Sequence, residues 1–148
     1  MKMISNKPTR DTLQKRFVER YLLTHFDHPT AAEIYRGAKA ENLSLGLTTV
    51  YRILEGFLSE GKVVVIKANG QVHYDWIRND HYHFVCDSCG KIIDLRGDND
   101  LLEGLCARHE FLLYSLQGVV IHGLCRACAE KEKKSILPKE EKCNGKRS

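Results

Sequence analysis

Four of the six cysteines form two pairs with two residues between their members, Cys86–Cys89 and Cys125–Cys128. A turn of this kind lets two thiolates face one cation at about 2.3 Å, and two turns complete a tetrahedral four-sulfur zinc site. Because such a site has no open position, we expect a structural zinc that ties the final helix to the first turn. A thiol redox motif, which needs only one pair, is the alternative. The other two cysteines stay unassigned: Cys106 and Cys143.

Histidines and carboxylates form a second group. His81 and His83 alternate along a predicted strand and so face the same side. Asp75 precedes them and Asp94 follows on the next strand, and imidazole with carboxylate favours Fe2+, Mn2+ or Zn2+. Spacing alone is weak evidence here, because a His-x-His pair is often exposed or satisfied without a metal. No local feature marks the remaining histidines as ligands: His25, His28, His73, His109 and His122.

The first half of the chain predicts three helices and a hairpin. Helical spacing of apolar residues covers 12–25 and 47–57, and a capping-box pattern at Thr30 and Glu33 starts the helix between them. Two β-branched or aromatic runs, 63–67 and 72–76, flank the hairpin signal Asn69-Gly70. This order is typical of a winged helix-turn-helix, whose third helix enters the DNA major groove.

After Asp80 the pattern changes to short strands around the cysteine turn. Residues 84–85 and 92–93 predict two strands, 101–106 a helix, and the apolar run 112–121 a third strand. A final helix rich in Ala, Lys and Glu follows Cys125. We therefore expect an α+β protein: an N-terminal winged helix-turn-helix followed by a small α/β domain with a three-stranded sheet.

Composition and charge limit the possible functions. Of 148 residues, 43% are apolar and 28% charged, which is typical of a folded protein. No run of about 18 apolar residues and no signal-like segment is present, so we expect a cytoplasmic protein without a membrane span. The net charge of +4 is uneven: residues 1–79 carry 12 basic and 8 acidic side chains, 80–124 carry 3 and 7, and 125–148 carry 8 and 4. The basic first part could meet a polyanion and the acidic middle could hold cations.

Five short motifs occur in a fixed order. They are His28-Pro29-Thr30-Ala31, Thr49-Val50-Tyr51-Arg52, Asp80-His81-Tyr82-His83, Cys86-Asp87-Ser88-Cys89-Gly90-Lys91 and Gly123-Leu124-Cys125-Arg126-Ala127-Cys128. With these motifs the chain resembles the ferric uptake regulator family over residues 12–128, and within that family it is most similar to the peroxide-responsive repressors.

The resemblance implies a homodimer with two domains per subunit. Residues 1–77 would be the winged-helix DNA-binding domain, 78–79 the hinge, 80–135 the dimerisation and metal-binding domain, and 136–148 a mobile polar tail. Structural zinc would be bound by Cys86, Cys89, Cys125 and Cys128. A regulatory Fe2+ or Mn2+ would be bound by His28, Asp75, His81, His83 and Asp94.

Position 94 bears on what is sensed. It is Asp, as in the peroxide sensors, where iron sensors of the family usually have Glu. The shorter side chain leaves room for peroxide at an open metal position, and the resemblance implies that peroxide oxidises His28 or His81. We therefore expect a metal-dependent repressor that senses peroxide. Iron sensing, and zinc or manganese sensing, remain alternatives.

The predicted recognition helix, 47–57, would turn Val50, Ile53 and Leu54 inward. The candidate contacts to bases and phosphates are Lys15, Arg16, Thr48, Thr49, Tyr51 and Arg52. On this interpretation the chain is not an enzyme, and its partners are double-stranded operator DNA, a second copy and peroxide. From other classes, a zinc-stabilised thiol redox protein and a zinc scaffold that does not bind DNA remain open.

Overall fold

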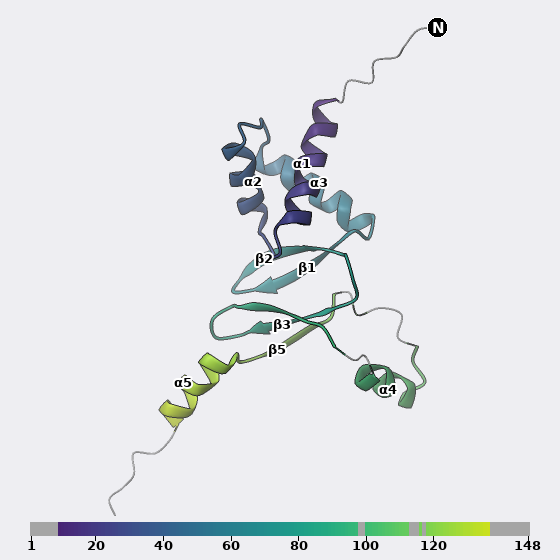
Figure 1. Cartoon of the computed structure of the whole chain (residues 1–148), viewed down its shortest axis with the longest axis vertical. Coiled ribbons are helices and arrows are strands. Elements are labelled where there is room, and N and C mark those ends of the chain that lie inside the picture. Colours follow the sequence, from purple (N-terminus) through teal and green to yellow (C-terminus); the bar gives the residue numbers. More distant parts are fainter. Residues whose placement is uncertain (1–8, 98–99, 113–115, 117, 137–148) are drawn as a thin grey trace, which may run out of the picture.

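The computed structural model describes residues 9–97, 100–112, 116 and 118–136. Figure 1 shows a layer of three helices above a hairpin, a second sheet beneath the hairpin, and two further helices that project on opposite sides. The expected α+β class is confirmed. In chain order the elements are α1 (Arg10–Thr24), α2 (Ala31–Ala40), α3 (Leu47–Ser59), β1 (Val63–Ala68), β2 (Gln71–Trp76), β3 (Tyr82–Cys86), β4 (Ile92–Leu95), α4 (Asp100–Arg108), β5 (Val120–Gly123) and α5 (Arg126–Ile136).

Helices α1–α3 share one apolar core, because each presents an apolar face at helical spacing. Leu22, Ile34, Leu54 and Phe57 are all but completely buried in it, and Val63 of β1 packs against the same cluster. The three expected helices are present with shifted ends. Helix α1 begins at Arg10 because the side chain of the preceding residue, a threonine, accepts a hydrogen bond from a backbone N–H of the first turn.

Helix α2 begins with the capping box that the sequence predicts. The Glu33 backbone N–H donates to Thr30 Oγ1 at 3.3 Å, and the Thr30 N–H donates to Glu33 Oε2 at 2.7 Å. These bonds satisfy two donors that a helix start otherwise leaves free. The same backbone hydrogen bond lowers the pKa of the Glu33 carboxyl.

Replacing Thr30 with alanine removes this cap. We expect the free energy of unfolding to fall by about 1 kcal/mol, measured by urea denaturation followed by circular dichroism. Ser59→Ala is the control: the Ser59 hydroxyl donates only to the Glu55 carbonyl one turn back on an exposed surface, so its loss should cost less than about 0.5 kcal/mol. Equal losses in the two variants would contradict the capping role.

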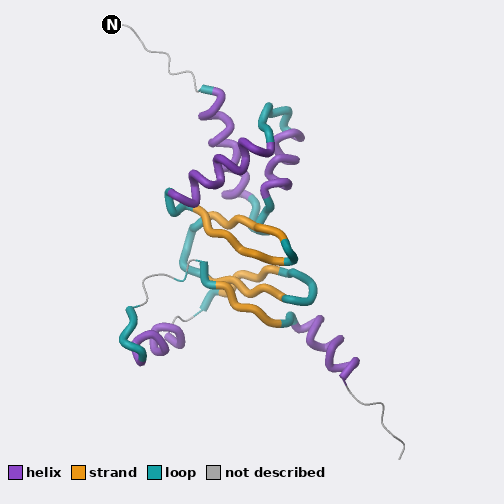
Figure 2. The backbone as a smooth tube through the Cα atoms, turned by 180° about the vertical axis from the view of Figure 1, so that it is seen from behind, coloured by secondary structure: helices purple, strands orange, loops and turns teal. Residues whose placement is uncertain are grey.

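The β1–β2 hairpin lies between the helices and the second sheet (Figure 2). Its turn residues, Asn69 and Gly70, have φ angles of 55° and 71°, as a two-residue type I′ turn requires. On the side away from the helices, Ile66 and Ala68 pack against Val85 of β3. The hairpin is thus buried on both faces, and it joins the two halves of the chain into one packed structure.

The second sheet has the strand order β4-β3-β5, with β3 antiparallel to β4 and parallel to β5. Three strands were expected, but the prediction of a third strand over 112–121 is wrong in its extent. The Val119 N–H donates to the Leu116 carbonyl, and Gly118 has a φ of 79°. This turn interrupts the apolar run. The chain therefore pairs with β3 only after the turn, and β5 spans Val120–Gly123. Most of the expected polar tail, residues 137–148 with Cys143, lies outside the described residues.

Candidate metal centres

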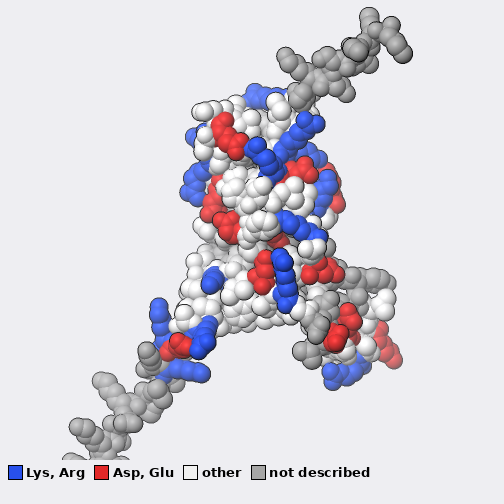
Figure 3. Space-filling model, viewed as in Figure 1, with Lys and Arg blue, Asp and Glu red and all other residues white. Residues whose placement is uncertain are grey.

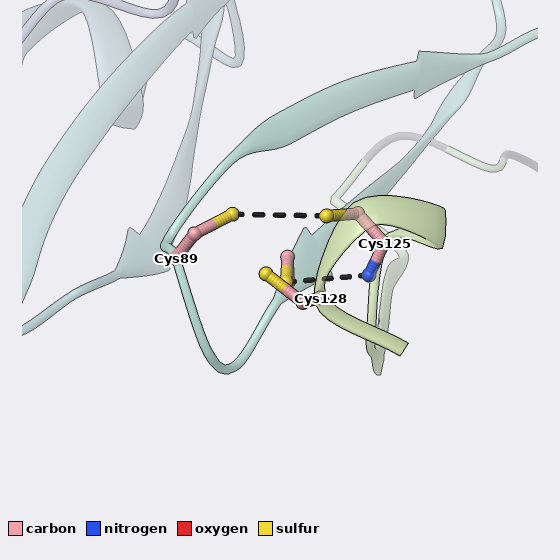
Figure 4. Close-up of side chains that lie close together, drawn as sticks. Cys89, Cys125 and Cys128 are labelled. Atoms are coloured by element: carbon pink, nitrogen blue, oxygen red, sulfur yellow. Dashed lines mark hydrogen bonds between the residues drawn. The ribbon is translucent and has the colours of Figure 1, made fainter. Parts of the chain in front are cut away.

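The two cysteine pairs come together at one end of the second sheet. Cys86 ends β3 and Cys89 lies in the turn before β4, while Cys125 precedes α5 and Cys128 lies in its first turn. The four sulfur atoms all lie within 4.8 Å of one another, and Cys89 Sγ is 3.9 Å from Cys125 Sγ. In Figure 4 the labelled side chains converge from the turn and from the helix. This spacing suits an ion that four sulfur atoms bind in tetrahedral geometry, such as zinc.

Hydrogen bonds already favour charge on one of these sulfurs. The backbone N–H groups of Cys125 and Cys89 lower the pKa of the Cys86 thiol to about 6. The Ser88 hydroxyl lowers the pKa of Cys128, but the neighbouring thiols and burial outweigh it and raise that pKa to about 11. Without a cation, Cys86 therefore favours the thiolate and Cys128 the thiol, and a bound zinc ion would displace the proton of Cys128.

A second cluster of five side chains lies where the hairpin meets the second sheet. His81 Nε2 is 3.0 Å from His83 Nε2 and 3.0 Å from Asp75 Oδ2. His28 Nε2 is 2.8 Å from Asp94 Oδ1, and His83 Nε2 is 3.6 Å from the same oxygen. Three imidazole nitrogens and two carboxylate oxygens thus converge, from the α1–α2 loop, β2, the start of β3 and β4.

Protonation in this cluster favours metal binding. Burial lowers the pKa of His28 and outweighs the opposing charges of Asp94 and Asp75, so the ring is neutral at pH 7. Burial by itself raises the pKa of Asp75, but the hydrogen bond from His83 and the charges of the three histidines together lower it. His81 Nδ1 lies 2.8 Å from the Asn79 carbonyl; donation there leaves the Nε2 lone pair free for an ion.

One further observation indicates that a divalent ion fits between these residues. His28 Nε2 and Asp94 Oδ1 are buried and close together, yet neither atom makes a hydrogen bond among the described residues. Buried polar atoms without partners are costly, and a cation between their lone pairs would satisfy both. The mixed nitrogen and oxygen donors suit Fe2+, Mn2+ or Zn2+ better than a soft ion.

A cleft of about 540 Å³ opens onto this second cluster. His28 and Asp94 lie in its wall, beside Phe26, His73 and Lys91. Asp94 keeps 28% of its side chain exposed, whereas His83 is completely buried. The cleft is therefore a path along which a small molecule could reach the cluster from solvent.

The candidate DNA-contacting residues are partly available on the surface. On α3, Thr48, Tyr51 and Arg52 are exposed, and Thr49 is half-buried. Lys15 of α1 is also exposed, and it forms an ion pair with Glu60, at 2.9 Å from Nζ to Oε1. Arg16 is exposed on the same helix. Figure 3 shows Lys and Arg over the helical layer, interspersed with acidic side chains, and again on α5.

The comparisons with known proteins agree with this geometry. The model of the ferric uptake regulator family matches residues 6–117. The chain belongs to this family. It is 32% identical over 125 residues to the peroxide operon regulator of Bacillus subtilis, covering 83% of this chain and 86% of that protein.

Solved structures of the same family are also similar to this chain. The peroxide stress regulator of Campylobacter jejuni has 33% sequence identity and a TM-score of 0.66, over 80% of this chain and 91% of that one. The ferric uptake regulator of Helicobacter pylori has a TM-score of 0.69 at 21% identity, over 83% and 82%, and shows the shared fold. The family resemblance expected from the sequence motifs is thereby confirmed.

Membership makes this chain a metal-responsive regulator of the ferric uptake regulator family. The relatives named above are regulators rather than enzymes, which supports a role without catalytic turnover. Within the described residues, no helix is long and apolar enough to cross a membrane.

One residue at the second cluster was not recognised in the sequence. His73 lies on β2 with Asp75 and contacts the segment that carries His28. The signal for it was present, because residues two apart on a strand face the same side. That spacing places His73 beside the cluster only once Asp75 is known to face the cluster.

Proposed function

We propose that this chain is a cytoplasmic repressor that binds operator DNA as a homodimer, depends on a regulatory Fe2+ or Mn2+ ion, and senses peroxide. The observation that carries the proposal is the convergence of His28, Asp75, His81, His83 and Asp94 beside an open cleft. The aspartate at position 94 and the similarity to peroxide regulators favour peroxide over iron as the signal. Structural zinc at the four cysteines completes the proposal.

The five ligands would link the two proposed domains. His28 and Asp75 belong to the DNA-binding domain, residues 1–77, and the other three belong to the domain at 80–135. An ion held by both sets would favour one arrangement of the domains over others, by the difference in its affinity for them. In a dimer, that arrangement fixes the spacing between the two α3 helices and hence the fit to an operator.

Peroxide would act by removing a ligand. A ferrous ion held by the five ligands would supply the redox chemistry that cleaves the O–O bond of peroxide. In the net reaction one oxygen atom of H2O2 is inserted into the ring of His28 or His81, and the other leaves as water. The oxidised ring no longer donates the same lone pair, so the link between the domains weakens and the operator is released.

The exposed surface supports both proposed macromolecular partners. Tyr51 and Arg52 on α3 can meet base edges and phosphates, and this binding should weaken with salt. For the second copy, several large apolar side chains on the second sheet and in the segments around it are 37–74% exposed: Leu105, Phe111, Leu112, Ile121 and Leu124. Because β5 is also an edge strand, a second copy covering this region would bury apolar surface that a monomer leaves in water.

Operator binding with each metal tests the proposal. Zinc-loaded protein is mixed with an operator fragment and Fe2+ or Mn2+, each with and without H2O2. We expect both metals to support binding, and peroxide to abolish it only with iron. Mass spectrometry should then find one added oxygen on the His28 or His81 peptide.

Each alternative predicts a different result. Iron sensing predicts that the iron-loaded protein stays on DNA after peroxide, with no added oxygen on either peptide. A thiol redox protein predicts a thiol titre that changes at mild potential, without about one zinc ion per chain. A zinc scaffold predicts no metal-dependent shift of any operator fragment.

A further inference from the structure

His73 holds the loop that carries His28. Its ring Nδ1 lies 2.7 Å from the His28 backbone carbonyl. Since a carbonyl oxygen only accepts, Nδ1 must carry the proton and donate it. The other ring nitrogen, Nε2, is buried and has no hydrogen-bond partner in the described part of the chain. The polar contact of this ring is thus directed at the backbone of His28.

The backbone of β2 fastens the same loop. The Tyr74 N–H donates to the Pro29 carbonyl at 3.0 Å, and Thr30 forms an isolated bridge with His73. The loop thus lies along β2 and pairs with it at one isolated bridge. Asp75 follows two residues after His73 on the same face of β2. This face therefore bears one proposed ligand, Asp75, and the side chain that contacts the backbone of a second, His28.

His28 needs such a support because of its conformation. Its φ is 56°, in the left-handed region that residues with a side chain rarely adopt. A conformation of this kind persists only where surrounding contacts impose it. The imidazole of His28 is 95% buried, so a small rotation of its backbone would move Nε2 away from the point where the five donor atoms meet.

We propose that His73 is a positioning residue for the regulatory metal: its Nδ1–H bond to the His28 carbonyl fixes the direction of the His28 ring. This inference rests on the proposed function, because it takes His28 as a ligand. His73 itself does not contact the ion. Partners of this kind orient metal ligands, and their loss typically costs 10–100-fold in metal affinity.

Two substitutions with the same chemistry test the position of the donor. Asn places an amide N–H near the site of the imidazole Nδ1, whereas Gln places it one bond further along. The probe is Co2+ added to zinc-loaded protein, with affinity and visible absorption spectrum as the two readouts. We expect His73→Asn to match the wild type, and His73→Gln to bind Co2+ about 10–100-fold more weakly with a shifted spectrum.

His28→Ala separates the two proposals. If it binds Co2+ like the wild type, the proposed ligand set is wrong. If it loses binding while His73→Gln matches the wild type in affinity and spectrum, the role of His73 is overturned and the ligand set stands.

The protonation state of the His73 ring can be measured on the wild-type chain, so this test does not depend on a variant that folds. Nitrogen NMR of the zinc-loaded protein should show the His73 ring protonated at Nδ1. A ring protonated only at Nε2 would overturn the inference, because it could not donate to His28.

Discussion

Replacing Cys86 with serine is expected to abolish zinc binding and, with it, folding of the second sheet. Cys86 ends β3, and its sulfur accepts a hydrogen bond from the Cys125 N–H at 3.3 Å, so it joins the sheet to the segment that begins α5. Structural zinc contributes about 10–16 kcal/mol in small zinc domains at pH 7, which is as large as the whole stability of a typical domain, about 5–15 kcal/mol. In Figure 1, α5 extends away from the second sheet after β5, and the cluster joins Cys125 and Cys128 at its start to Cys86 and Cys89.

Zinc content, far-ultraviolet circular dichroism and gel filtration measure the result. We expect about one zinc ion per chain in the wild type and almost none in Cys86→Ser, which should also aggregate or lose the proposed dimer. Cys106→Ser is the matched control, since Cys106 is a half-buried thiol on α4 outside the four-sulfur cluster. A Cys86→Ser chain that kept its zinc and its stability would contradict the structural site.

Replacing Asp75 with asparagine should remove metal-dependent operator binding. The side chain keeps its size but loses its charge, and its oxygen lies 3.0 Å from His81 and 3.3 Å from His83. Loss of a direct ligand should cost more than the 10–100-fold typical of an outer partner, so we expect Mn2+ affinity to fall by at least about 100-fold. Isothermal titration of zinc-loaded protein with Mn2+ measures this loss.

The same titration has a predicted pH dependence. Protons compete with the metal for its ligands, so affinity falls as the pH falls through the pKa of His28. Burial lowers the pKa of His28, and the pKa of Asp75 is also lowered. Neither group should therefore be protonated at pH 7, and we expect the part of the affinity that depends on His28 to fall only below about pH 6.5, the ordinary pKa of histidine.

Asp100→Asn is the control for both measurements. Asp100 is an exposed carboxylate at the start of α4, outside the proposed metal sites. Its loss should leave Mn2+ affinity and pH dependence unchanged. If the two aspartate variants bind Mn2+ equally well, Asp75 is not a ligand.

Short-range patterns predicted several elements because the deciding contacts lie within a few residues. The capping box at Thr30 and the Asn69-Gly70 turn are of this kind, and both form as the sequence indicated. The start of β5 was not predictable in the same way. The run 112–121 has the composition of a strand, but a turn at Gly118 and pairing with β3 decide where the strand begins.

Among the candidate DNA contacts, the exposure of α3 residues was predictable from the sequence, whereas the ion pair of Lys15 was not. Helical spacing was enough to separate the buried residues of α3 from the exposed Tyr51 and Arg52. The ion pair of Lys15 with Glu60 could not be foreseen, because the two residues come close only when α1 packs across the end of α3.

The sequence by itself determined the family and the two cysteine turns, because a Cys-x2-Cys spacing places two sulfurs in one turn whatever surrounds it. The family resemblance already implied that His28 and Asp94 bind one ion. Only the tertiary structure shows His28 Nε2 at 2.8 Å from Asp94 Oδ1 and His73 Nδ1 at 2.7 Å from the His28 carbonyl. These residues lie on separate elements, and their distances depend on how the β1–β2 hairpin packs between the helices and the second sheet. That packing sums many weak apolar contacts over the whole chain, so no local pattern specifies it.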